Sequence, residues 1–254
     1  MLNLSKEPMG VWRVVLISFE VLFSNLFKFV PLMVLAIALA SLYFFIITHV
    51  FGYSAEMLKN LKHSNLPPEE LKTIAAHLMW PYCLLSGIYN LIFFHRINAI
   101  ISREPGNIIK SIWWMFKNLF KVIGALILGS ITLAVAFFAK VLIIPYAILY
   151  MILAFYYPLF VSDDLKILGA YIDAVRFTFR RFWRNLFLFF IVMPLLGIIL
   201  IAPIVGLILG FKDLITINAQ YFIIIVYSLI VTAILWLMYK IAIYVQAQNL
   251  KISA

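Results

Sequence analysis

The chain has 254 residues, of which 66% are hydrophobic and 12% are charged, against about 45–50% and about 25% in soluble domains. A soluble fold of this length has too little interior for so much apolar surface, whereas a membrane protein can expose apolar side chains to hydrocarbon. Composition therefore excludes a soluble globular protein, and the single Cys83 excludes a disulfide within the chain and a cysteine-based metal site.

Six segments are long and apolar enough to cross about 30 Å of hydrocarbon as helices. In chain order they are Phe29–Phe51, Ala76–His95, Val122–Ala139, Val141–Val161, Leu186–Phe211 and Tyr221–Tyr239. The third and fourth form one run of about forty residues, which is about twice the length that one spanning helix needs. We therefore expect a tight hairpin there, with Lys140 and Pro145 near its turn.

The loop between the first two spans contains the sequence "NLPPEELKT". Pro68 followed by Glu69 and Glu70 is typical of a helix start, because acidic side chains are stabilised at the positive end of the helix dipole. The sequence predicts a helix that begins there and continues into the second span, with a kink at Pro81.

The net charge of +10 is distributed unevenly between the two sides that these spans define. Fifteen Lys and Arg residues lie in the N-terminal segment, residues 96–121, residues 162–185 and the tail from Lys240, and five lie in the opposite segments. Because Lys and Arg are enriched in cytoplasmic loops, both termini are predicted to be cytoplasmic. The positive charge then faces anionic lipid headgroups, and a nucleic-acid partner is not needed to explain it.

One short phrase occurs three times, each time just before an apolar segment. It reads "LFSNLFKF" at residues 22–29, "MFKNLFKV" at 115–122 and "FWRNLFLF" at 182–189, and its asparagines are Asn25, Asn118 and Asn185. In each copy, apolar residues lie ten, six, three and two positions before the asparagine, which places them on one side of a helix. We expect each asparagine to mark a structural corner, where its side chain bonds backbone groups that the bend leaves free.

The helices before the second and third copies carry a basic side. In sequence order its residues are Lys110, Lys117, Lys121, Arg176, Arg180, Arg181 and Arg184. A basic helix with an aromatic-rich apolar side, next to a span, is typical of a helix that lies in the headgroup plane. These seven residues are the candidate binding site for anionic phospholipid. The alternative is that they only fix the topology of the chain.

The three phrases also predict an internal repeat. Each unit would be an in-plane helix, a span out, a turn and a span back, over residues about 11–96, 105–162 and 163–240 of a single integral membrane domain, 1–254. The predicted fold class is an all-α membrane protein with six transmembrane helices and three cytoplasmic in-plane amphipathic helices. Chance is the other explanation, because Asn, Leu and Phe are all common here.

The stretch "VLIIPYAILYMILAFYYPLFVSDDLKILGAYIDAVRFTFRRFWRNL", residues 141–186, resembles the YciC family of bacterial inner-membrane proteins. The segment "LPPEELKTIAA" and the asparagine near residue 25 fit the same family pattern. The chain is also similar in pattern to the membrane portion of some glycerophosphodiester phosphodiesterases, although it has no attached catalytic domain. The resemblance implies a multi-span inner-membrane protein and brings no biochemical activity with it.

No constellation for catalysis is found in the sequence. No acidic residue lies clearly within a predicted span, and His49, His63, His77 and His95 lack the i, i+4 spacing of a helical metal site. We therefore expect a protein that is not an enzyme, with no metal and no cofactor.

Two functional hypotheses remain. The first is a non-enzymatic inner-membrane protein that binds anionic phospholipid and supports membrane or envelope organisation, with other membrane proteins or a second copy as possible partners. The second is a transporter or conduit for a lipid or another apolar cargo. Sparse charge within the spans disfavours an ion-coupled transporter of polar solutes.

The predicted topology can be tested by cysteine labelling on a Cys83→Ser background. A membrane-impermeant reagent added from outside should label Ser64→Cys and should not label Ser253→Cys, because residues 52–75 are predicted to be outside and the C-terminus inside. Labelling of position 253 from outside would contradict the charge-based orientation.

Overall fold

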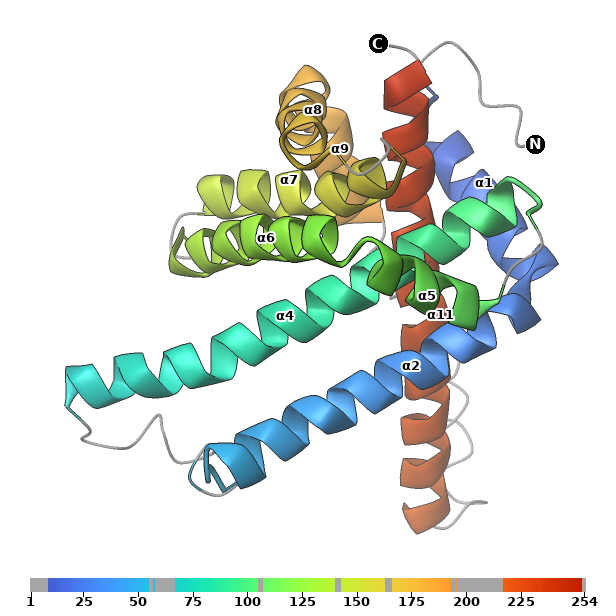
Figure 1. The fold of residues 1–254 in the computed structure, drawn as a ribbon. Helices are drawn as coiled ribbons and strands as arrows, with labels where there is room; N and C mark the ends of the chain where they lie inside the picture. Colours follow the sequence, from blue (N-terminus) through green and yellow to red (C-terminus); the bar gives the residue numbers. More distant parts are fainter. Residues whose placement is uncertain are drawn as a thin grey trace. The chain divides into compact units, whose positions relative to one another are not determined.

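The computed structural model describes residues 9–54, 57, 67–104, 107–139, 143–162, 166–192, 195 and 217–252. All regular structure in these ranges is helical, as the sequence predicts (Figure 1). The α-helices are α1 (Val11–Ser24), α2 (Leu26–Phe45), α4 (Pro68–Ile101), α5 (Ile108–Lys117), α6 (Leu119–Ala139), α7 (Ile143–Ser162), α8 (Ile167–Arg180), α9 (Phe182–Phe187) and α11 (Ile217–Ile252), and the π-helical turns are η1 (Ile46–Val50) and η3 (Leu188–Val192).

Five helical stretches within the described ranges are long and apolar enough to cross a membrane. They are Leu26–Val50, Lys72–Ile101, Leu119–Ala136, Ile144–Ser162 and Val231–Ile252. The first four overlap the first four predicted spans, which confirms a helical chain in which several helices are long and apolar enough to cross a membrane. The fifth predicted span, Leu186–Phe211, lies for the most part outside the described residues.

The sixth predicted span ends too early. The sequence analysis treated the residues from Lys240 onward as a tail, whereas α11 continues to Ile252. The reason is that this segment is apolar enough to pack, and Ile241, Tyr244 and Val245 are buried. Lys240 is accommodated because its ammonium lies 5.7 Å from the centre of the Trp236 ring, within the range of a cation–π contact.

Two predicted local features can be compared directly with the structure. Helix α4 begins at Pro68 with Glu69 and Glu70 in its first turn, which confirms the predicted helix start. Helix α7 begins at Ile143, so Pro145 lies in the first turn after the predicted hairpin, while Lys140 lies outside the described residues.

The described chain divides into two compact units, and the boundaries fall next to Leu26 and within α8. The first unit covers residues 27–175 and contains α2, α4, α5, α6, α7 and the first part of α8. The second contains α1, the end of α8, α9, η3 and α11. We describe each unit by itself.

The core of the first unit is the packing of α4, α6 and α7, which lie side by side in Figure 1. The Tyr157 ring of α7 lies against Gly87 of α4 and Gly129 of α6, so closely that a Cβ at either glycine would collide with its hydroxyl group. Small residues let helices approach each other in lipid, where packing and not the hydrophobic effect drives association. These two glycines therefore set the spacing of the three helices.

Helix α2 packs on α4 through separated aromatic contacts. Phe29 and Phe93 lie with ring centroids 6.4 Å apart, and the Tyr43 hydroxyl donates to the carbonyl of Leu78 at 3.2 Å. Beyond η1, Tyr53 shares a 2.8 Å hydrogen bond with Nδ1 of His77. Most of α2 is exposed, which suits a helix surrounded by lipid.

In the second unit, α1 packs along α11. Val14 and Leu22 of α1 are fully buried, as are Leu237, Ile241 and Leu250 of α11. Because buried residues of α1 recur every three or four positions, one side of this helix is committed to the protein.

The Gly129 contact gives the first structural prediction. Gly129→Ala should destabilise the protein by about 1–3 kcal/mol, because the added methyl group overlaps the Tyr157 hydroxyl. Thermal unfolding in detergent measures the loss, and adding Tyr157→Phe should recover part of it by removing that hydroxyl.

Gly169→Ala is the matched control, because a Cβ at this exposed helical glycine meets only the Lys166 side chain, with its Cβ at 3.4 Å and its Cδ at 4.0 Å. That variant should be neutral or more stable by about 0.5–1 kcal/mol, since alanine favours a helix. Equal behaviour of the two alanine variants would show that the Tyr157 contact does not limit helix spacing.

Candidate functional site

The first two copies of the repeated phrase lie at interruptions between helices. Asn25 separates α1 from α2, and Asn118 separates α5 from α6, both with dihedral angles outside the helical region. The Asn25 side-chain amide donates to the carbonyl of Val21 at 3.0 Å, and that of Asn118 donates to the carbonyl of Trp114 at 2.9 Å. Both asparagines thus satisfy carbonyl groups at the end of the preceding helix, as expected.

The third copy requires a correction. The interruption falls at Arg181, which separates α8 from α9, and Asn185 lies four residues later inside α9. Asn185 still serves the end of α8, because its amide reaches back eight residues and donates to the carbonyl of Phe177 at 3.1 Å. The break lies at Arg181, whose dihedral angles are non-helical (φ −141°, ψ 45°). The asparagine therefore binds the end of α8 from a position beyond the break.

The helices before these interruptions, α1, α5 and α8, share one division of their surface into three rows. The buried row of each helix packs on another helix of its own unit. On α5, the buried Ser111 hydroxyl lies 3.0 Å from Nδ1 of His95 in α4. On α8, the Tyr171 hydroxyl accepts a hydrogen bond from Thr132 of α6 at 3.1 Å.

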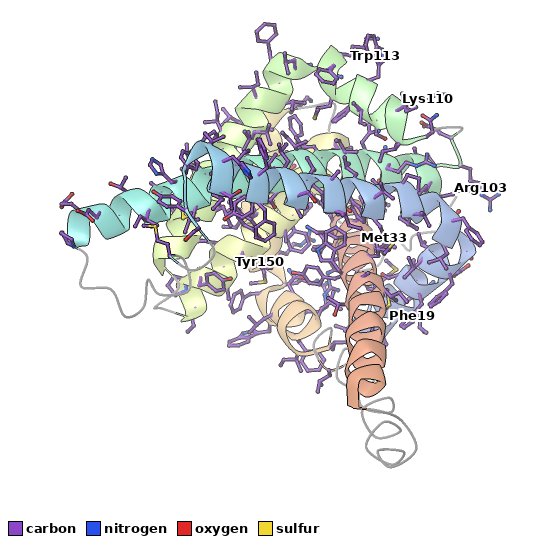
Figure 2. All side chains as sticks on the ribbon, turned by 90° about the horizontal axis from the view of Figure 1, so that it is seen from below. Phe19, Met33, Arg103, Lys110, Trp113 and Tyr150 are labelled. Carbon is purple, nitrogen blue, oxygen red and sulfur yellow. The ribbon has the colours of Figure 1, made fainter. Side chains whose placement is uncertain are left out.

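The second row on each helix is apolar and exposed. Its members fall within about 60° of one another at 100° per residue. They are Trp12, Leu16 and Phe23 on α1, Ile109, Trp113 and Phe116 on α5, and Leu168, Ile172 and Phe179 on α8. Figure 2 shows Trp113 projecting away from α5 at the edge of the molecule.

The third row is polar and exposed, about 80° around each helix from the apolar row. Its members are Arg13, Glu20 and Ser24 on α1, Lys110 and Lys117 on α5, and Arg176 and Arg180 on α8. Each of the three helices thus has a buried row, an exposed apolar row and an exposed polar row, although the polar row of α1 carries no net positive charge. The sequence analysis predicted a single apolar stripe, and the structure instead divides the apolar residues between a buried and an exposed row.

An exposed phenylalanine follows two of the interruptions. Phe27 is 88% exposed at the start of α2, and Phe120 is 89% exposed at the start of α6. Both lie two residues after the asparagine of the repeated phrase. Phe187, in the same place after Asn185, is 44% exposed.

The seven basic residues predicted as one site do not share one environment. Lys110, Lys117, Arg176 and Arg180 are exposed in the third row, and Lys121 is exposed in the first turn of α6. Arg181 is half-buried at the break. Arg184 is also half-buried, and its Nη1 donates to the carbonyl of Met9 at 2.8 Å.

Arg184 belongs to a buried polar cluster in the second unit. The Asn249 side-chain oxygen accepts a hydrogen bond from the Met9 amide at 2.9 Å, and Gln246 donates to the Asn185 side-chain oxygen at 3.1 Å. Burial, followed by the repulsion of Arg181, lowers the pKa of Arg184 to about 10, so it remains charged at neutral pH. Arg184 therefore acts mainly within the fold, where it links the N-terminal segment to α9.

Sequence reasoning missed Gln246 and Asn249. Their only signal was their polarity in an otherwise apolar segment, and that segment had been assigned to a tail. The histidines in the described ranges include His77, stacked on Phe51 at 4.4 Å, and His95, stacked on Trp114 at 4.5 Å. In those ranges, no three His, Cys, Asp or Glu side chains gather in a group that could hold a metal ion.

Comparison of the chain with family models, with curated proteins and with solved structures finds no match. The site is therefore interpreted from its own geometry.

The buried asparagine should matter most for stability. Asn185→Ala should cost about 1–3 kcal/mol, because it leaves the Phe177 carbonyl and the Gln246 amide without their partner in a buried place. Asn118→Ala removes one bond in a partly exposed place and should cost about 0.5–1.5 kcal/mol. Thermal unfolding of both variants measures which one loses more stability. A larger loss of stability for Asn118→Ala than for Asn185→Ala would contradict this prediction.

Proposed function

We propose that this chain is a non-enzymatic, multi-span protein of the bacterial inner membrane. In this proposal it binds anionic phospholipid at the cytoplasmic leaflet and supports membrane or envelope organisation. Its helices α1, α5 and α8 lie in the headgroup plane, and its spans number six in three related units. The resemblance of residues 141–186 to the YciC family supports the inner-membrane placement.

The observation that carries the proposal is the pair of adjacent exposed rows on α5 and α8. An apolar row beside a basic row suits a boundary where acyl chains meet charged headgroups. If the three helices lay in water, their nine large apolar residues would be exposed to it, which is unfavourable. If they crossed the bilayer instead, their charged residues would lie in hydrocarbon, which is also unfavourable. With the buried row against the protein, the boundary between acyl chains and headgroups accommodates both exposed rows.

The exposed phenylalanines after the interruptions fit the same placement. Phe27 and Phe120 begin the helices that continue into spans, so in this proposal they enter the acyl region just below the headgroups. Aromatic residues are enriched at this depth because their rings tolerate both environments.

Electrostatics favour anionic lipid at α5 and α8. Each Lys or Arg near an anionic surface contributes about 1 kcal/mol. The exposed residues Lys110, Lys117, Lys121, Arg176 and Arg180 can all act in this way. The arginines of α8 can each form two bonds to one phosphate, so we expect α8 to bind more strongly than α5.

Native mass spectrometry of the protein in mixed lipid tests the proposal. The variant Arg176→Gln with Arg180→Gln should retain phosphatidylglycerol about thirtyfold less well than the parent, because two contributions of about 1 kcal/mol are lost. Arg184 is left intact because its contacts stabilise the fold.

Two controls separate lipid binding from general loss of charge. Arg176→Lys with Arg180→Lys keeps the charge and should retain most of the binding, and Lys251→Gln removes a charge at the end of α11 and should change little. If the double glutamine variant keeps its phosphatidylglycerol with its topology intact, the basic row only fixes topology and the proposal is wrong.

A further inference from the structure

An apolar groove runs along the surface of the first unit between α4 and α6, both of which are candidate spans. Its volume is about 740 Å³, within the range of about 300–1,000 Å³ that holds small ligands. Its lining residues fall at helical spacing on one face of each helix. They are Lys72, Ala75, Ala76, Met79, Trp80, Cys83 and Leu84 on α4 and Ile123, Leu126, Ile127, Ser130, Ile131 and Ala134 on α6.

The groove suits a single hydrocarbon chain. Lys72 to Leu84 extends about 18 Å along α4, and Ile123 to Ala134 extends about 16 Å along α6, at 1.5 Å per residue. Each wall is thus about as long as one leaflet of a hydrocarbon core that is about 30 Å thick. Alanines at three positions leave the space open, and Trp80 supplies a flat wall.

The interior of the groove offers almost no polar partner. Apart from Lys72, the lining side chains with a polar group are Ser130, the weakly polar Cys83 and Trp80 with its single indole N–H. The backbone groups of α4 and α6 are engaged within their own helices, so a peptide strand could not pair with them. This composition favours an acyl chain over a peptide or a polar solute.

The end of the groove at Lys72 carries charges of both signs. The Lys72 ammonium lies 3.1 Å from a carboxylate oxygen of Glu69, and both side chains are largely exposed. Glu70 is exposed in the same turn. An exposed ion pair contributes little to stability in water. The Lys72–Glu69 pair can therefore separate, and each residue can bind a group of opposite charge on a ligand.

We propose that this groove binds one acyl chain of a zwitterionic aminophospholipid, such as phosphatidylethanolamine. Its phosphate contacts Lys72, and its ammonium group contacts Glu69 or Glu70. An anionic lipid without an amine would meet two carboxylates and one ammonium, which is unfavourable. The charged residues at this end of the groove thus favour a zwitterionic headgroup, whereas the basic rows on α5 and α8 favour an anionic one.

This lipid site is separate from the anionic-lipid site proposed above, because it lies on different helix faces and prefers a different headgroup. It needs only that α4 and α6 lie in a membrane. Either site can therefore fail in experiment without the other.

Native mass spectrometry of the full chain in equal phosphatidylethanolamine and phosphatidylglycerol tests the site. Ala76→Trp fills the groove and should reduce retained phosphatidylethanolamine about tenfold, and Lys72→Glu should reduce it as well by repelling the phosphate. Neither variant should alter retained phosphatidylglycerol. Val34→Trp places the same indole side chain on exposed α2, outside the groove, and should have no effect.

Unchanged phosphatidylethanolamine retention in Ala76→Trp would overturn the groove. A drop in Ala76→Trp without one in Lys72→Glu would overturn the headgroup assignment, and so would equal losses of both lipids. A second measurement avoids any bulky substitution. Brominated acyl chains quench the fluorescence of nearby tryptophans. The contribution of Trp80 is the quenching that is lost in Trp80→Phe. This contribution should be larger with brominated phosphatidylethanolamine than with brominated phosphatidylglycerol. Equal quenching by the two lipids would contradict the proposal.

Discussion

Backbone groups in the hydrocarbon region must find hydrogen-bond partners within the protein, because acyl chains offer none. A helix that stops frees several carbonyl groups at its end, so each interruption of this chain creates a requirement for donors. Asn25 and Asn118, which lie at the breaks, donate side-chain hydrogen bonds to such carbonyl groups, and Asn185 does so from within the next helix. The three-row surface of α1, α5 and α8 depends on these solutions, because without a stable break each helix would simply run on into the next segment.

The two kinds of solution have different consequences for the fold. At Asn118 the side chain acts alone and stays partly exposed, so the break is a local matter between α5 and α6. At Asn185 the side-chain oxygen also accepts from Gln246, and the neighbouring Arg184 binds Met9, which in turn donates to Asn249. This chain of contacts joins three segments of the second unit that lie far apart in the sequence, namely the residues around Met9, α9 and α11. These bonds favour one arrangement of the N-terminal segment, α9 and α11, although within the described residues Arg184 Nε and Nη2 and the Gln246 side-chain oxygen have no hydrogen-bond partner.

Much of the fold could be predicted because composition and local chemistry point the same way. Long apolar runs without charges give spanning helices, and the Pro68-Glu69-Glu70 start of α4 follows from capping preferences. The end of α11 could not be predicted in this way, because Lys240 resembles the start of a cytoplasmic tail until the Trp236 ring beneath it is known. The apolar groove was equally out of reach, since it depends on which faces of α4 and α6 meet.

Helical spacing predicted the exposure of some of the candidate-site residues and not of others. Helical spacing placed Lys110, Lys117, Arg176 and Arg180 on polar faces, where they are exposed. Spacing alone could not distinguish Arg184, whose half-buried place depends on a carbonyl 175 residues away. Nor could it separate Val15 and Leu22, which face the protein, from Trp12 and Leu16, which do not.

The central claim is that α5 and α8 lie at the level of the headgroups with their exposed apolar row toward the acyl chains. Spin labels placed one at a time at Trp113 and Lys117 of α5, in the full chain in bilayers, measure this by their accessibility to oxygen and to a water-soluble nickel complex. The account predicts that the label at 113 is reached mainly by oxygen, at a depth of about 5–10 Å within the boundary of headgroups and acyl chains, and the label at 117 mainly by nickel. Equal access of the nickel complex to both positions would place α5 in water, and exclusion of nickel from both would place it within the bilayer; either result would contradict the account.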